Sequence, residues 1–334
     1  LGGNGGTAPA ALPATFSAWQ AQNGLGGQNQ PNDDPDADGH TNLLEHALGT
    51  PAASGLQTAR FRLETNAETG TIDALVTRPA GEHADLRYSL ERSTDLVTWK
   101  PLLMAAAVTT GSDQTVTLRY VDIESAAGVP QGFVRLKVTL DADLDGTAEA
   151  TAHAPALGYA RRTFPVGRQT FSMPLLKPAV FTGRVASMNG TQIKLPVTVA
   201  LSAMPHYVDV LEGPLTGQTF DIDADLKLSS GLPLAGVRVS IRPHWTLGML
   251  LPHGIFDAGV DESSADRALT FDPATNGFLS HALADENATA RVVRPQEGFF
   301  VQLRTQATTV VLLGEARTVP LALPQSAGTR FLGT

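Results

Sequence analysis

Residues 132–140, Gly-Phe-Val-Arg-Leu-Lys-Val-Thr-Leu, carry the pattern that decides the class of this fold. Apolar and polar side chains alternate along this stretch, as they do in a β-strand, whose successive side chains point to opposite faces of a sheet. Four earlier stretches alternate in the same way or are rich in β-branched residues: residues 60–63, 73–77, 86–92 and 115–120. Turn residues separate the stretches at intervals of about ten residues. We therefore expect an antiparallel β-sandwich over residues 56–155.

The chain beyond residue 156 contains a second series of strand-like stretches with many glycine and proline breaks. They are residues 160–164, 169–172, 182–188, 191–195, 207–210, 237–241, 298–303 and 308–313. Such a density of turns favours a compact sandwich or barrel over a helical fold. We expect residues 156–334 to form a second β-rich domain.

The N-terminal part of the chain predicts two short helices. Over residues 12–25, Phe16 and Trp19 lie three residues apart on one helical face, and Gly24 suits the end of the helix. A second helix is expected to end near Leu48, because a glycine follows it and helical periodicity is lost soon afterwards.

Residues 1–11 are glycine-rich, and we expect either a flexible tail or an extended arm that another molecule orders. The first residue is Leu1 and not Met, so we expect that a leader has been removed from the chain. The expected fold class is mainly β: a helix-loop-helix segment at residues 12–55, followed by two antiparallel β-sandwich or barrel-like domains.

Residues 34–45 fit the calcium-loop pattern D-x-D-x-D-G-x5-E without a gap. Carboxylates two residues apart in a tight turn point at one central cation, and Ca²⁺ takes six to eight oxygen ligands. The predicted ligands are Asp34, Asp36, Asp38, the backbone carbonyl of His40, Asn42 directly or through water, and both oxygens of Glu45. We expect a structural calcium clamp in this loop; the alternative is an acidic, solvated loop without an ion.

A second acidic stretch, Asp141-Ala-Asp143-Leu-Asp145-Gly, begins in the same way. Its twelfth position is Ala152, so the closing carboxylate is missing, although Glu149 could replace it from a different geometry. The alternatives are a second calcium site and a plain Asp-Gly turn at a domain boundary. A third group, residues 221–225, alternates aspartates along a strand-like segment, which predicts a solvated edge.

The composition excludes several classes of protein. The chain has 334 residues, of which 42% are hydrophobic and 17% are charged, so wholesale disorder is excluded. With 24 basic and 33 acidic residues, the net charge of −9 argues against a nucleic-acid partner. The absence of cysteine excludes disulfides, thiol catalysis and iron–sulfur clusters. No stretch approaches the ~18 apolar residues that a membrane helix needs.

No familiar catalytic motif is present: there is no G-x-S-x-G, H-E-x-x-H, phosphate loop or dinucleotide fingerprint. We therefore expect a protein that is not an enzyme. Two alternatives remain. One is an adhesin that binds a carbohydrate or matrix through exposed aromatic residues, with Trp99, Tyr207 and Trp245 as candidates. The other is a secreted polysaccharide hydrolase with an acid pair among Asp257, Asp261, Glu262 and Asp266.

Several phrases together resemble known exported proteins. FSAWQAQNG (residues 16–24) and DDPDADGHTNLLEHALGT (residues 33–50) resemble the N-terminal calcium segment of secreted multidomain proteins of Verrucomicrobia, which is akin to thrombospondin type 3 and dockerin loops. YSLERSTDLVTWKPL (88–102) and GFVRLKVTLDADLDG (132–146) resemble the β-sandwich that follows it there. The phrases at residues 158–178, 206–223, 242–252 and 297–304 resemble an uncharacterised verrucomicrobial family.

The resemblance implies a secreted protein of the extracellular space or cell surface. It carries over no catalytic residue, and dockerins have two complete calcium loops where this chain has one, so docking to a cohesin is not expected. We expect a structural protein, with a filament subunit as its specific form. Its expected partners are copies of itself, joined head to tail by strand donation from residues 1–11, or an extracellular polysaccharide.

Overall fold

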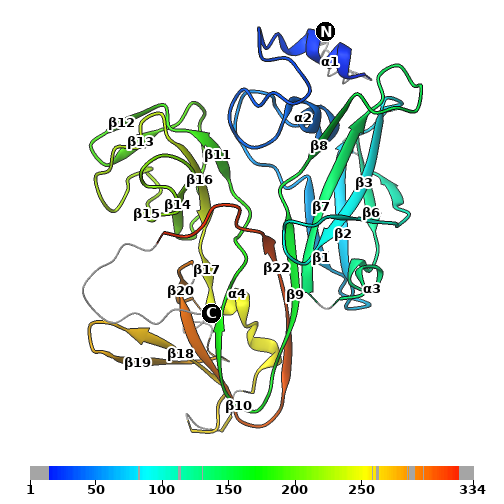
Figure 1. Ribbon diagram of the computed structural model, residues 1–334. Coiled ribbons are helices and arrows are strands. Elements are labelled where there is room, and N and C mark those ends of the chain that lie inside the picture. Colours follow the sequence, from blue (N-terminus) through cyan, green and yellow to red (C-terminus); the bar gives the residue numbers. More distant parts are fainter. Residues whose placement is uncertain are drawn as a thin grey trace, which may run out of the picture.

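The computed structural model describes residues 15–322, except residues 82, 112–113, 130, 258, 261–262, 284, 286–289 and 296. The fold is mainly β, as predicted, with several antiparallel sheets and a few short helices (Figure 1). The predicted arm at residues 1–11 lies outside the described residues. Among the described residues, no helix combines the length and the apolar character that crossing a membrane requires.

Two sheets pack face to face to form a β-sandwich. The first has the order β1-β2-β6-β5, and the second has the order β22-β9-β7-β3-β4, with β8 beside β7. The bounds of the first are β1 Phe61–Thr65, β2 Ile72–Pro79, β6 Thr115–Tyr120 and β5 Ala107–Thr110. Those of the second are β22 Thr308–Glu315, β9 Leu157–Phe164, β7 Gln131–Leu140, β3 Leu86–Ser93, β4 Lys100–Leu102 and β8 Ala150–His153.

The alternation that predicted β7 sets its burial. Val134, Leu136 and Val138 are fully buried, and the polar residues between them are half-exposed. The core between the sheets also takes Ile72 and Val76 from β2. Strand β7 is therefore a central strand with one face in the core, as its period of two requires.

Strand β22, from the late part of the chain, belongs to this sandwich. It pairs along its whole length with β9, from Thr308 opposite Phe164 to Glu315 opposite Leu157. The six-stranded sheet thus contains strands from both predicted β units, residues 56–155 and 156–334. One consequence is that the end of β22 lies beside the N-terminal part of the chain.

The rest of the chain forms two smaller β units with separate cores. One holds the sheet β10-β21-β18-β19, and the other holds the sheet β11-β16-β14-β15. The bounds of the first sheet are β10 Gly167–Ser172, β21 Gly298–Leu303, β18 Arg267–Asp272 and β19 Gly277–Ala282. Those of the second are β11 Phe181–Arg184, β16 Arg238–Pro243, β14 His206–Val210 and β15 Thr219–Ile222.

The remaining elements are short. They comprise the pairs β12 Ser187–Asn189 with β13 Gln192–Lys194 and β17 Trp245–Thr246 with β20 Val292–Val293, the helices α3 Ile123–Ala127 and α4 Leu247–Leu250, and the 3-10 turn η1 His253–Ile255. The sequence did not predict β18 and β19. On β19 the middle residues are all exposed, so no burial alternation marks that strand.

Both predicted helices are confirmed. Helix α1 spans Phe16–Asn23, with Phe16 and Trp19 buried and stacked at 5.6 Å between ring centroids. Helix α2 spans Asn42–Leu48 and packs into the core of the sandwich. Glycines in the left-handed conformation, Gly24 and Gly49, end the two helices, because this conformation costs glycine little.

Candidate metal centre

The loop at residues 34–45 gathers the acidic side chains that its spacing predicted. One carboxylate oxygen from each of Asp34, Asp36 and Asp38 lies within 4.8 Å of the others, so the group could hold a metal ion. The backbone folds back on these carboxylates: the N–H of Asp38 donates to Asp34 (3.0 Å) and to Asp36 (3.1 Å), and the N–H of Gly39 donates to Asp34 (3.0 Å). These bonds hold three negative charges at close range.

Glu45 is the residue that distinguishes this loop from an ordinary acidic turn. It lies in the first turn of α2 and is completely buried, and neither carboxylate oxygen has a hydrogen-bond partner. Burial raises the pKa of Glu45 to about 10, and the charges of Asp36, Asp38 and Asp34 contribute to this rise. A buried carboxylate without a donor is costly, and the charges of the three aspartates add to that cost. Glu45 is not a member of the group whose oxygens lie within 4.8 Å of one another, so its direct ligation stays a prediction.

The pKa values of two of the aspartates are raised as well. Burial, followed by the charge of Asp36, raises the pKa of Asp38 to about 7. The pKa of Asp34 is also raised, mainly by burial, although hydrogen bonds and Arg238 oppose the rise. A cation at the centre of the group would reverse these shifts, since an opposite charge favours the ionised carboxylate.

The other two predicted ligands also lie in the loop region. Asn42 is fully buried, its amide nitrogen donates to the carbonyls of Gln28 (3.0 Å) and Gln30 (2.8 Å), and its amide oxygen has no partner. The imidazole of His40 is buried, with Nδ1 3.7 Å from a carboxylate oxygen of Asp38, and burial lowers its pKa. Ligation through the His40 carbonyl stays a prediction.

Three contacts that the sequence did not predict tie the loop to other parts of the chain. The N–H of Gly55 donates to Asp36 (2.7 Å), and the side-chain amide of Gln57 donates to Asp38 (2.8 Å). Arg238 on β16 donates from Nε to the carbonyl of Ala37 (2.5 Å), although the two residues are 201 positions apart. No local pattern could reveal the Arg238 contact, because it depends on how β16 packs.

The second acidic stretch forms a different kind of cluster. Asp141, Asp143, Asp145 and Glu149 each offer an oxygen within 4.8 Å of the others, so Glu149 lies close enough to act as the substitute for Ala152 that the sequence suggested. Asp141 is buried but already binds Arg87 at 2.8 Å, and the other three are exposed. This cluster could hold a metal ion, but it has no buried carboxylate without a partner like Glu45.

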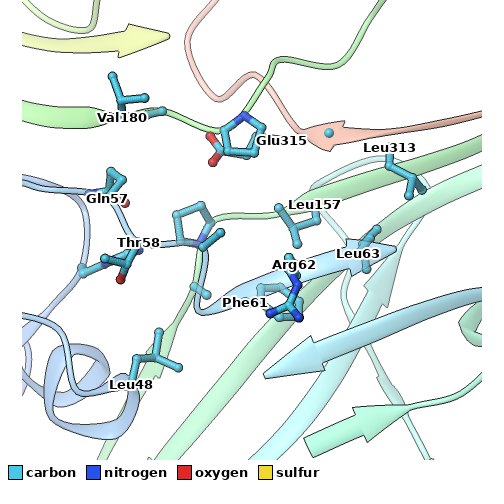
Figure 2. Close-up of a pocket in the computed structure, with 17 residues that line it drawn as sticks. Leu48, Gln57, Thr58, Phe61, Arg62, Leu63, Leu157, Val180, Leu313 and Glu315 are labelled. Atoms are coloured by element: carbon cyan, nitrogen blue, oxygen red, sulfur yellow. The ribbon is translucent and has the colours of Figure 1, made fainter. Parts of the chain in front are cut away.

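A cavity of about 370 Å³ lies beside the metal loop (Figure 2). Leu63, Leu157 and Leu313 supply an aliphatic wall, and Gln57 lies on the opposite side. Glu315 also lines the cavity and is paired with Arg242 at 2.5 Å. His40, which belongs to the acidic loop, and Gln57, which donates to Asp38, thus also line the cavity.

Other carboxylates singled out in the sequence have structural partners. Asp266 is fully buried and accepts the N–H groups of Asp257 and Arg304, each at 2.8 Å. Asp257 accepts the N–H of Gly259, while Asp261 and Glu262 lie outside the described residues. Asp221 lies on the edge strand β15 and binds His244 (3.0 Å) and Arg294 (3.1 Å); Asp223 and Asp225 lie in the exposed turn that follows it.

The aromatic residues considered for carbohydrate binding are partly withdrawn from solvent. Tyr207 is buried on β14 against His244, with ring centroids 4.7 Å apart. The indole of Trp245 donates to the carbonyl of Leu175, and Arg135 lies over the ring of Trp99 at 4.2 Å. Tyr207 and Trp245 line one small pocket, whereas Trp99 follows β3 in the sandwich, so the three residues do not form one exposed platform.

Comparison of the chain with protein-family models, with curated proteins and with solved structures gives no match. The resemblance to verrucomicrobial exported proteins therefore stays a prediction.

Proposed function

We propose that this chain is a non-enzymatic structural protein of the extracellular space or cell surface, braced by one Ca²⁺ ion in the loop at residues 34–45. The observation that carries the proposal is Glu45: both of its oxygens are buried and unpartnered, and the charges of the three clustered aspartates raise its pKa further. Carboxylates whose charges oppose one another need a compensating positive charge, and a bound cation supplies it.

The chemistry of the ligands selects the ion. The clustered carboxylates of Asp34, Asp36 and Asp38 are hard oxygen donors, as are the unpartnered oxygens of Glu45 and Asn42. Oxygen-only sites with several carboxylates suit Ca²⁺, which accepts six to eight ligands in flexible geometry. Mg²⁺ demands a tighter octahedron and keeps several waters, so it fits a crowded loop less well.

The position of the loop supports a brace. On one side, α2 carries Glu45 and packs into the sandwich core. On the other side, the loop accepts a hydrogen bond from Arg238 on β16, and residues 55–57 pair with the start of β11 through a bridge between Leu56 and Phe181. An ion in the loop would fix both sides at once.

The non-enzymatic assignment is supported by the structural hydrogen bonds that the other candidate carboxylates make. Asp266 and Asp257 receive backbone N–H groups, which stabilise the turns that they join. A self-assembling filament subunit, joined head to tail, is the specific form that we propose. Strand donation by residues 1–11 would need an open sheet edge, and β5, β15 and β19 each end a sheet.

Isothermal titration calorimetry with Ca²⁺ tests the brace. We compare the parent protein with Glu45→Gln, which keeps the size of the side chain but removes its charge, and with Glu149→Gln, a matched control in the second acidic loop. We expect one site whose affinity falls at least tenfold in Glu45→Gln and is unchanged in Glu149→Gln.

Thermal unfolding gives the second readout. Because the ion binds the folded chain, the melting temperature should rise with the Ca²⁺ concentration and fall in excess chelator. An unchanged melting temperature, with no heat of binding at residues 34–45, would exclude the brace. Turnover in a screen of polysaccharide substrates would exclude the non-enzymatic assignment.

A further inference from the structure

The sheet β10-β21-β18-β19 carries phenylalanines on its outer face. Phe271 and Phe278 are opposite each other in the register, and Phe300 is opposite Leu269. Paired residues of an antiparallel sheet point to the same face, and the rings follow one another at 5.6 Å and 5.3 Å between centroids. The opposite face of this sheet, with Phe299 and Val301, fills the core of its unit.

This outer face is accessible to solvent. Phe278 is 47% exposed, and the other two phenylalanines and Leu269 are half-buried. Contiguous exposed apolar surface of this kind marks an interaction site more often than scattered single residues do.

Two arginines border the phenylalanines. Arg168 on β10 lies opposite Gln302, and its guanidinium lies over the Phe300 ring at 5.6 Å. Arg304 places its guanidinium 2.9 Å from the side chain of the same Gln302. Both arginines are exposed, and neither has a carboxylate within ion-pair distance among the residues that the structure describes. The outer face of this sheet is therefore both apolar and basic, although the chain as a whole has a net charge of −9.

The opposite end of the molecule has complementary chemistry. The loop at residues 141–149 presents Asp143, Asp145 and Glu149 to solvent, and Leu144 between the aspartates is 62% exposed. The N–H of Asp141 donates to the backbone carbonyl of Asp85, whose side chain in turn accepts the N–H of Phe16 at the start of α1. Figure 1 shows α1 at one end of the molecule and the β18–β19 hairpin at the other.

We propose that the outer face of the sheet β10-β21-β18-β19 binds the loop at residues 141–149 of a second copy. Leu144 of that copy packs against Phe278 and Phe300, and its acidic side chains pair with Arg168 and Arg304. Because the two surfaces are different and lie at opposite ends, each copy can bind two others, and the contact continues as a chain. The inference rests on the proposed function in taking a copy of the protein as the partner.

Two charge-reversal variants test this contact by sedimentation velocity at constant free Ca²⁺. The face variant carries Arg168→Glu with Arg304→Glu, and the loop variant carries Asp143→Lys with Asp145→Lys. Each variant has one intact surface, so each should sediment as a single protomer when alone. Mixed in equal amounts, they should associate again, because the intact loop of one variant meets the intact face of the other, and the reversed loop and the reversed face are complementary too.

The control is Lys100→Glu with Lys194→Glu, which reverses two exposed lysines on β4 and β13. It should associate like the parent protein, and added salt should disperse the parent because charge pairs hold the contact. Association in the mixture also shows that both variants fold.

A parent protein that sediments as a single protomer at every concentration overturns the proposal. If deletion of residues 323–334 then produces association, the C-terminal segment of the same chain covers the face. If the monomeric parent binds alginate and the face variant does not, the face takes an acidic polysaccharide instead. The Ca²⁺ titration of residues 34–45 is independent of all these outcomes, so failure of the contact and failure of the brace are distinguishable.

Discussion

At the scale of single residues, the candidate metal centre depends on where Glu45 is held. An aspartate-rich turn on the surface can remain solvated without an ion, and the exposed carboxylates of residues 143–149 could do so. Glu45 is completely buried, because the residues that follow it on α2, Ala47 and Leu48, pack into the sandwich core. The side chain therefore cannot reach water, and a cation is the partner that suits its charge.

Gly55 is a second residue on which the centre depends. Its φ is +62°, its N–H donates to Asp36, and its carbonyl accepts the N–H of Thr182. A Cβ at this position would lie 2.4 Å from the carbonyl oxygen of Thr182. Gly55 thus allows the close approach between the metal loop and β11.

We expect Gly55→Ala to lower the free energy of unfolding more than Gly70→Ala does. Gly70 has a φ of +69°, and no atom lies within 4 Å of the position that a Cβ would take, so it isolates the cost of the left-handed conformation, about 1–2 kcal/mol. Denaturant unfolding in excess Ca²⁺ measures both variants. Equal losses in the two variants would show that the contact with Thr182 is not a constraint.

At the scale of elements, one buried carboxylate joins β2, β6 and α3. Asp73 on β2 is fully buried, binds Arg119 on β6 at 2.6 Å and accepts the N–H of Asp122 at 2.9 Å. Burial alone raises the pKa of Asp73, but the bonds from Asp122 and Arg119 outweigh it, and the net pKa lies below the usual 3.8. Asp73 therefore stabilises these elements in its ionised form.

We expect Asp73→Asn to cost about 1.5–3 kcal/mol at neutral pH, the usual contribution of hydrogen bonds to a charged group. Since the pKa is lower in the folded state, this stability is present above pH ~4 and is lost as the pH falls through the folded-state pKa. Unfolding free energies of the parent and the variant should therefore converge in acid. Glu68→Gln, an exposed neighbour, should change little, and a pH-independent difference for Asp73→Asn would contradict the assignment.

At the scale of the whole molecule, the metal loop connects units that the sequence separates widely. Residues 34–45 contact the sandwich through α2, the start of β11 through residues 55–57, and β16 through Arg238. The end of β22 adds Glu315, which pairs with Arg242 on β16. A brace at this junction would act on the relative placement of all these elements.

We expect Ca²⁺ removal to raise hydrogen exchange in two separate parts of the chain. Residues 34–57 should exchange faster because their carboxylates repel one another without the ion. Residues 180–184 and 236–239 should also exchange faster, since they lose an ordered partner. The central strand β7, outside the junction, is the internal control. If exchange becomes faster only in residues 34–45, the ion orders its own loop alone and does not brace the neighbouring elements.

The sequence by itself determined the mainly β class, the two short helices and the grouping of Asp34, Asp36 and Asp38, because each depends on periodicity or spacing within a few residues. Strands such as β6 and β21 have the predicted bounds for the same reason. Only the tertiary structure decided that β22 completes the sheet of the sandwich, that Arg238 reaches the metal loop, and that Phe278 and Phe300 share an outer face. These features join residues far apart in the chain, and their energies come from packing and hydrogen bonds that a local pattern does not contain.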